Sequence, residues 1–352
     1  MYKGNEITMK KINIGIIGAG SFSSIHLDGL ERISEANVCA ICDLDEKCAK
    51  TAAQKYSIPF WSTNYHDILK MTEIDAVIVV TGDQAHRQAT VDALNAGKHV
   101  LCEKPMALCM DDCKAMIEAS QKSGKKLMIG QICRYTPGFI KAKELVESGE
   151  IGELFYVESE YAHDYSKIGG NGGWRVTPER HPFIGGACHA MDLLRWIAGD
   201  PYEVFAYSNH KILTTWPVDD CTIAVMKFPG DVIGKVFNSV GCKRAYTMRT
   251  CLYGSKGTIV VDNTTPLLDL YKADVNGSER DFGRDWHNMK IQLIVPIDNH
   301  NTYGEIKEFI DCIVNNKDIV MTGKQGASTV SACLSVVESA KTGMPVKVNY
   351  DF

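Results

Sequence analysis

The sequence has no apolar run of the length that a membrane-spanning helix needs, which is about 20 residues. It also has no basic cluster, and its formal net charge is −5, so nucleic acid is not an expected partner. Its first residues, MYKGNEITMKK, lack the apolar core of a secretion signal. Internal repeats and low-complexity segments are absent as well. These absences predict a globular, cytoplasmic protein with no membrane partner.

The thirteen cysteines are an odd number in a chain without an export signal, which favours free thiols in a reducing compartment. Cys39 and Cys42 form a CxxC pair within NVCAICD. That run has the pattern of a strand, in which residues three apart point to opposite faces. We therefore interpret the pair as packing residues and not as a metal or redox site.

A chain of 352 residues is too long for one ordinary core and suggests two domains. In the first part, segments with a helical pattern alternate with apolar runs at residues 12–18, 37–43, 75–80, 99–103 and 125–130. Strands and helices that alternate in this way predict an α/β fold, a doubly wound parallel sheet of the Rossmann type. We assign this domain to residues 1–132.

The pattern changes after about residue 150. Strand-like runs separated by turn signals follow one another at 153–165, 222–230, 232–240, 249–262 and 266–274. Helical patterns return near the C-terminus, at 303–316 and 328–343. We assign residues 133–352 to an α+β domain with a mainly antiparallel sheet. Its C-terminal helices can pack either on this sheet or back on the first domain.

A glycine-rich turn follows the first predicted strand. In GIIGAGSFSS, Gly18 permits a tight turn and Gly20 lets the backbone approach a pyrophosphate at a helix N-terminus, while Ser23 stands where a third glycine is usual. Asp43 ends the second strand, where a carboxylate accepts hydrogen bonds from ribose hydroxyls and repels a 2′-phosphate. The pattern predicts NAD, with NADP less favoured. The alternative is a structural turn, with Asp43 as a helix cap.

Several motifs, spread over nearly the whole chain from Lys11 onward, resemble those of the Gfo/Idh/MocA family of oxidoreductases. They are GIIGAGSFSSIH, AGKHVLCEKPMAL, IGQICRYTP, SGEIGEL, GGWR, GGACHAMDLLRW and YGSKGTIVVD. The EKP triplet with HAMDLLRW downstream is the most specific combination. The resemblance implies a Rossmann domain, a second domain with a large open sheet, and NAD(P)-dependent oxidation of sugars, cyclitols or related compounds.

Lys104 is the lysine of the EKP triplet. It follows the predicted strand at 99–103, and ligands of open parallel sheets bind outside the carboxyl ends of the strands. Pro105 favours an extended backbone at Lys104, which we expect to aim the side chain into the cleft. The resemblance implies that this ammonium stabilises a developing alkoxide. The alternative is a solvated charge paired with Glu103.

His189 lies in GGACHAMDLLRW, and the resemblance makes it the general base that takes the hydroxyl proton. Asp192 is three residues further on, so it shares a helix face with His189 and is expected to bind a substrate hydroxyl or orient the cleft. Many relatives carry an Asp four residues before this histidine, whereas this chain has Gly185. Either Lys104 and His189 suffice, or another carboxylate enters, with Asp164 or Asp192 as candidates.

The remaining site residues are expected from the resemblance and from their places after predicted strands. The expected cofactor contacts are Gly18, Gly20, Ser21, Phe22, Asp43, Thr81, His86, Glu103 and Lys104. The expected substrate contacts are Arg134, Tyr135, His163, Asp164, Trp174, Arg175 and Asp192. For the first six the alternative is a structural role, and for His86 it is packing at a helix N-terminus. No metal site is expected, because the spacing of the His, Cys and Asp residues matches no compact ligand motif.

We therefore expect an NAD-dependent dehydrogenase that acts on a secondary hydroxyl of a sugar, glycoside or cyclitol, with glycoside 3-dehydrogenation as one subtype. Two alternatives stay open. One is a glycosidase that uses NAD transiently, with no net redox change, and the other is a non-catalytic sensor that binds a dinucleotide. The resemblance also implies a homo-oligomer, a dimer or tetramer, associated through the open sheet of the second domain.

Overall fold

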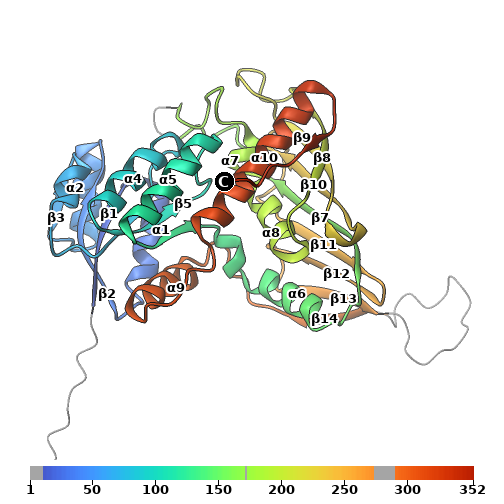
Figure 1. Ribbon diagram of the computed structural model, residues 1–352, viewed down its shortest axis with the longest axis horizontal. Helices are drawn as coiled ribbons and strands as arrows, with labels where there is room; N and C mark the ends of the chain where they lie inside the picture. The colour runs from blue at the N-terminus through green and yellow to red at the C-terminus, as the bar shows by residue number, and fades with distance from the viewer. Residues whose placement is uncertain (1–10, 171–172, 273–289) are drawn as a thin grey trace, which may run out of the picture. The chain divides into compact units, whose positions relative to one another are not determined.

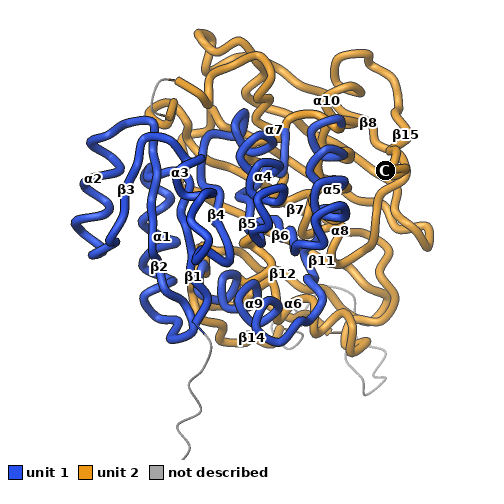
Figure 2. Tube along the Cα trace, turned by 60° about the vertical axis from the view of Figure 1, so that its left-hand side comes forward, with its two compact units in different colours: residues 1–107, 111–130, 302–324 blue, residues 108–110, 131–301, 325–352 orange. Residues whose placement is uncertain are grey.

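The computed structural model describes residues 11–170, 173–272 and 290–352 (Figure 1). Residues 1–10, 171–172 and 273–289 lie outside the described residues, and with them most of the MYKGNEITMKK segment. The chain forms two compact units, which Figure 2 shows in blue and orange. The described parts of residues 1–107, 111–130 and 302–324 make up unit 1, and residues 108–110, 131–301 and 325–352 make up unit 2.

Unit 1 is built on a parallel sheet of six strands in the order β3-β2-β1-β4-β5-β6. The strands are β1 (Ile12–Ile17), β2 (Ala36–Cys42), β3 (Phe60–Ser62), β4 (Ala76–Val79), β5 (His99–Glu103) and β6 (Leu127–Gly130). This is the strand order of a Rossmann domain, as predicted. The sequence analysis missed β3, because three residues are too few to show a period.

Helices connect these strands. They are α1 (Ser21–Leu30), α2 (Glu46–Lys55), α3 (Tyr65–Leu69), α4 (His86–Asn95) and α5 (Met110–Ser123). β1 and β4 are almost wholly apolar and buried, as strands covered on both faces must be.

A helix from far along the chain, α9 (Thr302–Val314), completes unit 1 beside α1. The hydroxyl of Thr302 donates to the carbonyl of Ile25 at 2.9 Å. Gly29 makes this approach possible, because a Cβ at that position would lie 2.7 Å from the Thr302 hydroxyl oxygen. The N-terminus of α9 is therefore fixed directly against the first helix of the Rossmann sheet.

Unit 2 is built on a nine-stranded sheet in the order β14-β13-β12-β11-β7-β10-β9-β8-β15. Only the β10–β7 pair among these described strands is parallel, so the prediction of a large, mainly antiparallel sheet is confirmed. The strands are β7 (Leu154–Ala162), β8 (Glu203–Asn209), β9 (Cys221–Lys227), β10 (Ile233–Ser239), β11 (Arg249–Gly254), β12 (Gly257–Asp262), β13 (Leu267–Lys272), β14 (Lys290–Ile294) and β15 (Val346–Lys347).

One face of this sheet carries the helices of unit 2. They are α6 (Pro137–Glu147), α7 (Pro182–Gly185), α8 (Cys188–Ala198) and α10 (Gly323–Thr342), of which α8 packs on β7 and β10 and α6 packs on β12 and β13. In β9 the buried residues Thr222, Ala224 and Met226 alternate with exposed ones, as in a strand with one covered face. The opposite face of this part of the sheet is open in unit 2.

All thirteen cysteines lie in the described residues, and none of them is in a disulfide. Cys42 is buried and Cys39 is partly exposed, both on β2. None of the helices in the described ranges is both long and apolar enough to cross a membrane.

Candidate functional site

The turn between β1 and α1 has the geometry of a phosphate-binding loop. Gly18 has φ of 109°, and a Cβ there would lie 2.3 Å from the carbonyl oxygen of Val80, so only glycine fits. Gly20 is the N-cap of α1, which has no side-chain cap, and a Cβ at Gly20 would meet nothing within 4 Å. The first N–H groups of α1 are therefore approachable by an anion.

Asp43 belongs to this loop. One carboxylate oxygen accepts from the backbone N–H of Ala19 at 2.6 Å, and the other accepts from the N–H of Asp45 at 2.9 Å. The following helix is capped instead by Asp45, which accepts from Lys47 and Cys48. The alternative interpretation of Asp43 as the cap of α2 is therefore not what the structure shows.

Lys104 follows the carboxyl end of β5. Its backbone N–H donates to the carboxylate of Glu103 at 3.1 Å, and the Lys104–Pro105 peptide bond is cis. The side chain is half-buried, and its ammonium makes no hydrogen bond or ion pair with any described residue. The predicted alternative, a solvated pair with Glu103, does not form, because the carboxylate of Glu103 is buried and contacts His26 at 2.7 Å.

His86 is a fully buried link between two loops of unit 1. Its ring nitrogens lie 2.8 Å from the carbonyl oxygen of Pro105 and 3.3 Å from that of Thr81. Burial acts to lower the pKa of His86, but the Cys102 thiol, the Asp83 carboxylate and the Pro105 carbonyl outweigh it and raise the pKa. His86 thus connects the turn after β4 to the turn that carries Lys104.

In unit 2, His189 lies in the first turn of α8 and is 2% exposed. Its Nδ1 is 3.3 Å from the sulfur of Cys133, and its ring stacks against that of Tyr161 at 6.1 Å between centroids. Tyr246 and His300 stack on each other and line a small pocket together with Cys133. The imidazole of His189 is therefore packed against aromatic rings, and its Nδ1 contacts the thiol of Cys133.

The aromatic cluster continues beyond His189. The hydroxyls of Tyr161 and Tyr165 are 2.7 Å apart, and His163 packs between the rings of Tyr161, Tyr165 and Tyr246. Burial raises the pKa of Tyr161 and of Tyr246, so both hydroxyls remain neutral donors or acceptors.

Asp192 and Arg134 form a buried ion pair within unit 2. The guanidinium donates two hydrogen bonds to the carboxylate, at 2.7 and 2.9 Å, and the hydroxyl of Thr329 donates a third at 2.8 Å. Arg134 is 7% exposed and Asp192 is 1% exposed. Both side chains are therefore structural: their hydrogen bonds join the loop after β6 to α8 and α10.

The place that a side chain at Gly185 would take is filled. A Cβ there would lie 2.3–2.5 Å from the guanidinium of Arg180, which donates to the Gly185 carbonyl at 3.2 Å. Arg180 is 2% exposed and packs 5.0 Å from the ring of Trp174. A buried guanidinium therefore fills the space beside Gly185.

The other predicted substrate contacts divide into two groups. Arg175 lies over the rings of Trp174 and Tyr165, at 4.6 and 6.0 Å. Asp164, by contrast, pairs with Lys243 at 3.1 Å, and the hydrogen bond from the N–H of Ser166 holds the pKa of Asp164 at about 2. Asp164 is thus ionised and already partnered.

Models of two protein families match the chain. One, described as the oxidoreductase family with an NAD-binding Rossmann fold, matches residues 12–131, and the other, the GFO/IDH/MocA C-terminal domain, matches residues 139–260. The inositol 2-dehydrogenase of Salmonella typhimurium is 32% identical over 70% of this chain and 72% of its own. The chain belongs to the Gfo/Idh/MocA family of oxidoreductases.

Other Gfo/Idh/MocA relatives extend the match to nearly the full length. An uncharacterised oxidoreductase of Bacillus subtilis, YrbE, is 28% identical over 97% of this chain and 98% of its own. A levoglucosan dehydrogenase solved with NADH and L-sorbose shares the fold, with a TM-score of 0.88 at 21% identity over 97% of this chain and 100% of that one. Family membership confirms the predicted Rossmann domain and NAD as its cofactor.

The residues of this Gfo/Idh/MocA chain fit that cofactor. Gly18, Gly20 and Asp43 come together at one loop of unit 1, and a side chain on Gly20 would meet open space.

Around His189 and Gly185 in unit 2 lie residues that were not predicted from the sequence, namely Cys133, Tyr161, Arg180, Tyr246 and His300. Only Cys133 carried a sequence signal, since it directly precedes the predicted Arg134.

Proposed function

We propose that this oxidoreductase transfers a hydride from a secondary hydroxyl of a sugar, glycoside or cyclitol to NAD. The observation that carries the proposal is Lys104, whose half-buried ammonium has no partner in the described residues and follows the carboxyl end of β5. Ligands of open parallel sheets bind at that edge. Relatives named inositol 2-dehydrogenase and levoglucosan dehydrogenase support the substrate class.

In this proposal, bound NAD would accept the hydride. Side chains of the protein would remove the hydroxyl proton and stabilise the negative charge that develops on the oxygen. We assign the hydroxyl proton to His189, whose Nδ1 lies 3.3 Å from the sulfur of Cys133. We assign the developing alkoxide charge to the Lys104 ammonium. Within unit 2 the ring of Tyr161 stacks on that of His189, which is only 2% exposed, so little water surrounds this base.

The test is a screen of sugars, glycosides and inositols for NADH formation by the purified protein. A substrate found there is then offered to Lys104→Met, for which we expect a loss of about 10²–10³-fold in kcat, as for other oxyanion donors. Lys122→Met, on the exposed last turn of α5, is the matched control and keeps wild-type turnover. Wild-type turnover in Lys104→Met would refute the assignment.

The same screen separates the alternative enzyme class. Release of an aglycone from a glycoside, with no net NADH, would indicate a glycosidase that uses NAD transiently. Binding of NAD without turnover of any compound would favour the sensor.

We also infer that the open face of the nine-stranded sheet joins copies of this chain into a homo-oligomer. Apolar side chains from three adjacent strands share that face, which the strand registers align: Phe205, Tyr207, Ile223, Val225, Ile233 and Phe237. Exposed apolar area of this kind marks an interaction surface. Light scattering after size-exclusion chromatography is expected to show an oligomer that Val225→Glu dissociates, and a monomeric wild type would end the inference.

A further inference from the structure

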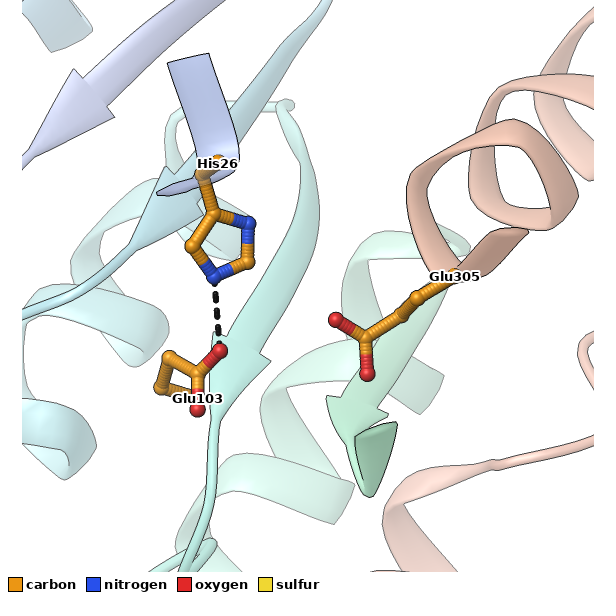
Figure 3. A group of neighbouring side chains, drawn as sticks. All are labelled: His26, Glu103 and Glu305. Carbon is orange, nitrogen blue, oxygen red and sulfur yellow. Dashed lines mark hydrogen bonds and ion pairs between the residues drawn. The ribbon is translucent and has the colours of Figure 1, made fainter. Parts of the chain in front are cut away.

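Unit 1 contains a buried cluster of three ionisable side chains that the proposed chemistry does not use. His26 comes from α1, Glu103 from the end of β5 and Glu305 from the first turn of α9 (Figure 3). Their exposed fractions are 0%, 5% and 0%, and their ligating atoms lie within 4.8 Å of one another. One member of the cluster, Glu103, directly precedes Lys104, the residue to which we assign the stabilisation of the alkoxide.

Glu305 is the unusual member of the cluster. Neither of its carboxyl oxygens has a hydrogen-bond partner among the described residues, although the side chain is fully buried. Figure 3 shows the carboxyl group pointing toward the His26–Glu103 pair. An ionised carboxylate in such a place would be very costly unless a cation paired with it.

Both carboxylate oxygens of Glu103 already have hydrogen-bond partners. One of its oxygens lies 2.7 Å from Nε2 of His26, and the other accepts from the backbone N–H of Lys104. These contacts outweigh burial and lower the pKa of Glu103. Burial, followed by the negative charges of Glu103 and Glu308, raises the pKa of Glu305, and the Lys104 ammonium only partly opposes this.

The groups that face Glu305 come from every element packed on it. They are His26 on α1, Glu103 and Lys104 at the end of β5, and Glu308 on α9 itself. Lys307, the basic residue of α9, forms ion pairs with Glu35 and Asp311 instead. Of the charges that act on Glu305, those of Glu103 and Glu308 therefore disfavour its ionisation, and that of Lys104 favours it.

A metal ion is a poor occupant of this cluster. Two ligands of a tetrahedral metal at about 2.1 Å would be about 3.4 Å apart. His26 Nε2 and Glu103 Oε1 are instead 2.7 Å apart, the distance of a direct hydrogen bond, and point at each other (Figure 3). The nearby ammonium of Lys104 would also repel a divalent cation. A proton on Glu305 satisfies the same charge balance without these conflicts.

We propose that Glu305 is a neutral, proton-carrying positioning residue that keeps the Lys104 ammonium available to substrate. A charged Glu305 would draw the ammonium back into the cluster as an ion pair, whereas a protonated one adds no negative charge to that of Glu103. The functional part rests on the role proposed above for Lys104. The protonation of Glu305 is tested without any substrate.

The test compares the stability of the wild type with that of Glu305→Gln, which keeps the size and neutrality of the protonated acid. An acid protonated in the folded state and ionised in the unfolded state loses stability as the pH rises above its ordinary pKa, here 4.5. Urea unfolding from pH 5 to 9 is therefore expected to favour Glu305→Gln over the wild type. The ratio of unfolding constants grows up to tenfold per pH unit until the folded-state pKa is reached.

Two controls keep the result specific. Glu118→Gln, at an exposed position of α5, is expected to show no such pH-dependent gain. Infrared difference spectra at neutral pH are expected to show the carbonyl stretch of a protonated carboxylic acid in the wild type and not in Glu305→Gln.

The opposite sign would overturn the proposal. If Glu305→Gln loses stability relative to the wild type as the pH rises, Glu305 is ionised and paired with a cation. If zinc or manganese chloride raises the Tm of chelator-treated wild type but not of Glu305→Gln, that cation is a metal. Once a substrate is known, the pH profile of kcat tests the positioning role. We expect kcat of the wild type, but not of Glu305→Gln, to fall above the pH at which the stability difference levels off, and identical profiles would overturn the role.

Discussion

The buried pair of Arg134 and Asp192 offers a test of what Asp192 does. Asp192→Ala would leave the guanidinium of Arg134, which is 7% exposed, without either of its hydrogen bonds at 2.7 and 2.9 Å. Removing one partner of a buried ion pair costs about 3–5 kcal/mol. For a domain of this size, each kcal/mol lowers the Tm by about 2–4 °C, so we expect a fall of ~6–20 °C.

Thermal and urea unfolding followed by circular dichroism measure this loss. Glu144→Ala is the matched control, since Glu144 pairs with Lys141 on α6 at 3.0 Å and their side chains are 57% and 43% exposed. An exposed pair contributes about 0–1 kcal/mol, so the control is expected to stay close to the wild type. The double variant Arg134→Met/Asp192→Leu is expected to recover much of the loss, because neither charge is then left unpaired.

The reasoning fails if Asp192→Ala is as stable as Glu144→Ala. If its KM for substrate also rises, Asp192 binds substrate, as its place one helical turn from His189 suggested in the sequence.

Three further changes are expected to have distinct effects. Asp43→Ser removes the carboxylate beside the glycine loop, so we expect a higher KM for NAD and a lower preference for NAD over NADP in steady-state assays with both cofactors; an unchanged preference would contradict the role of Asp43. Cys133→Ala removes the contact to Nδ1 of His189 and is expected to lower kcat about fivefold, whereas Cys133→Ser restores a hydrogen-bonding group; equal rates in both variants would exclude positioning by the thiol. Gly185→Ala places a methyl group against Arg180 and is expected to destabilise the protein by about 1–3 kcal/mol in urea unfolding, unless the guanidinium moves at no cost.

The Rossmann sheet could be predicted because its information is local. The central strands β1 and β4 are nearly continuous apolar runs, and the Gly18–Gly20 turn stands directly between a strand and a helix. Short strands carry no such signal: β3 has three residues and β15 has two, and both are held by the neighbour that they pair with. β8 was missed because only Val204 and Ala206 in it are buried and apolar.

The surroundings of the site residues could not be predicted for a related reason. Cys133 and His189 are 56 positions apart, and Arg134 and Asp192 are 58 apart, so no local pattern encodes either contact. The sequence shows that Asp192 shares a helix face with His189. It does not show that Arg134 arrives from another segment and uses both oxygens of that carboxylate. The fold decides which polar side chains remain for chemistry.

The bond between Thr302 and Ile25 joins positions 277 residues apart, which has a consequence for how the protein is made. During synthesis the whole six-stranded sheet leaves the ribosome long before α9 is translated. Until then His26 lacks its contact with Glu305, and Gly29 lacks its contact with Thr302. The nucleotide-binding half is finished only when almost the entire chain has been translated. A gene cut after the last strand of that sheet would yield a half without its closing helix, so one cut cannot separate the two units intact.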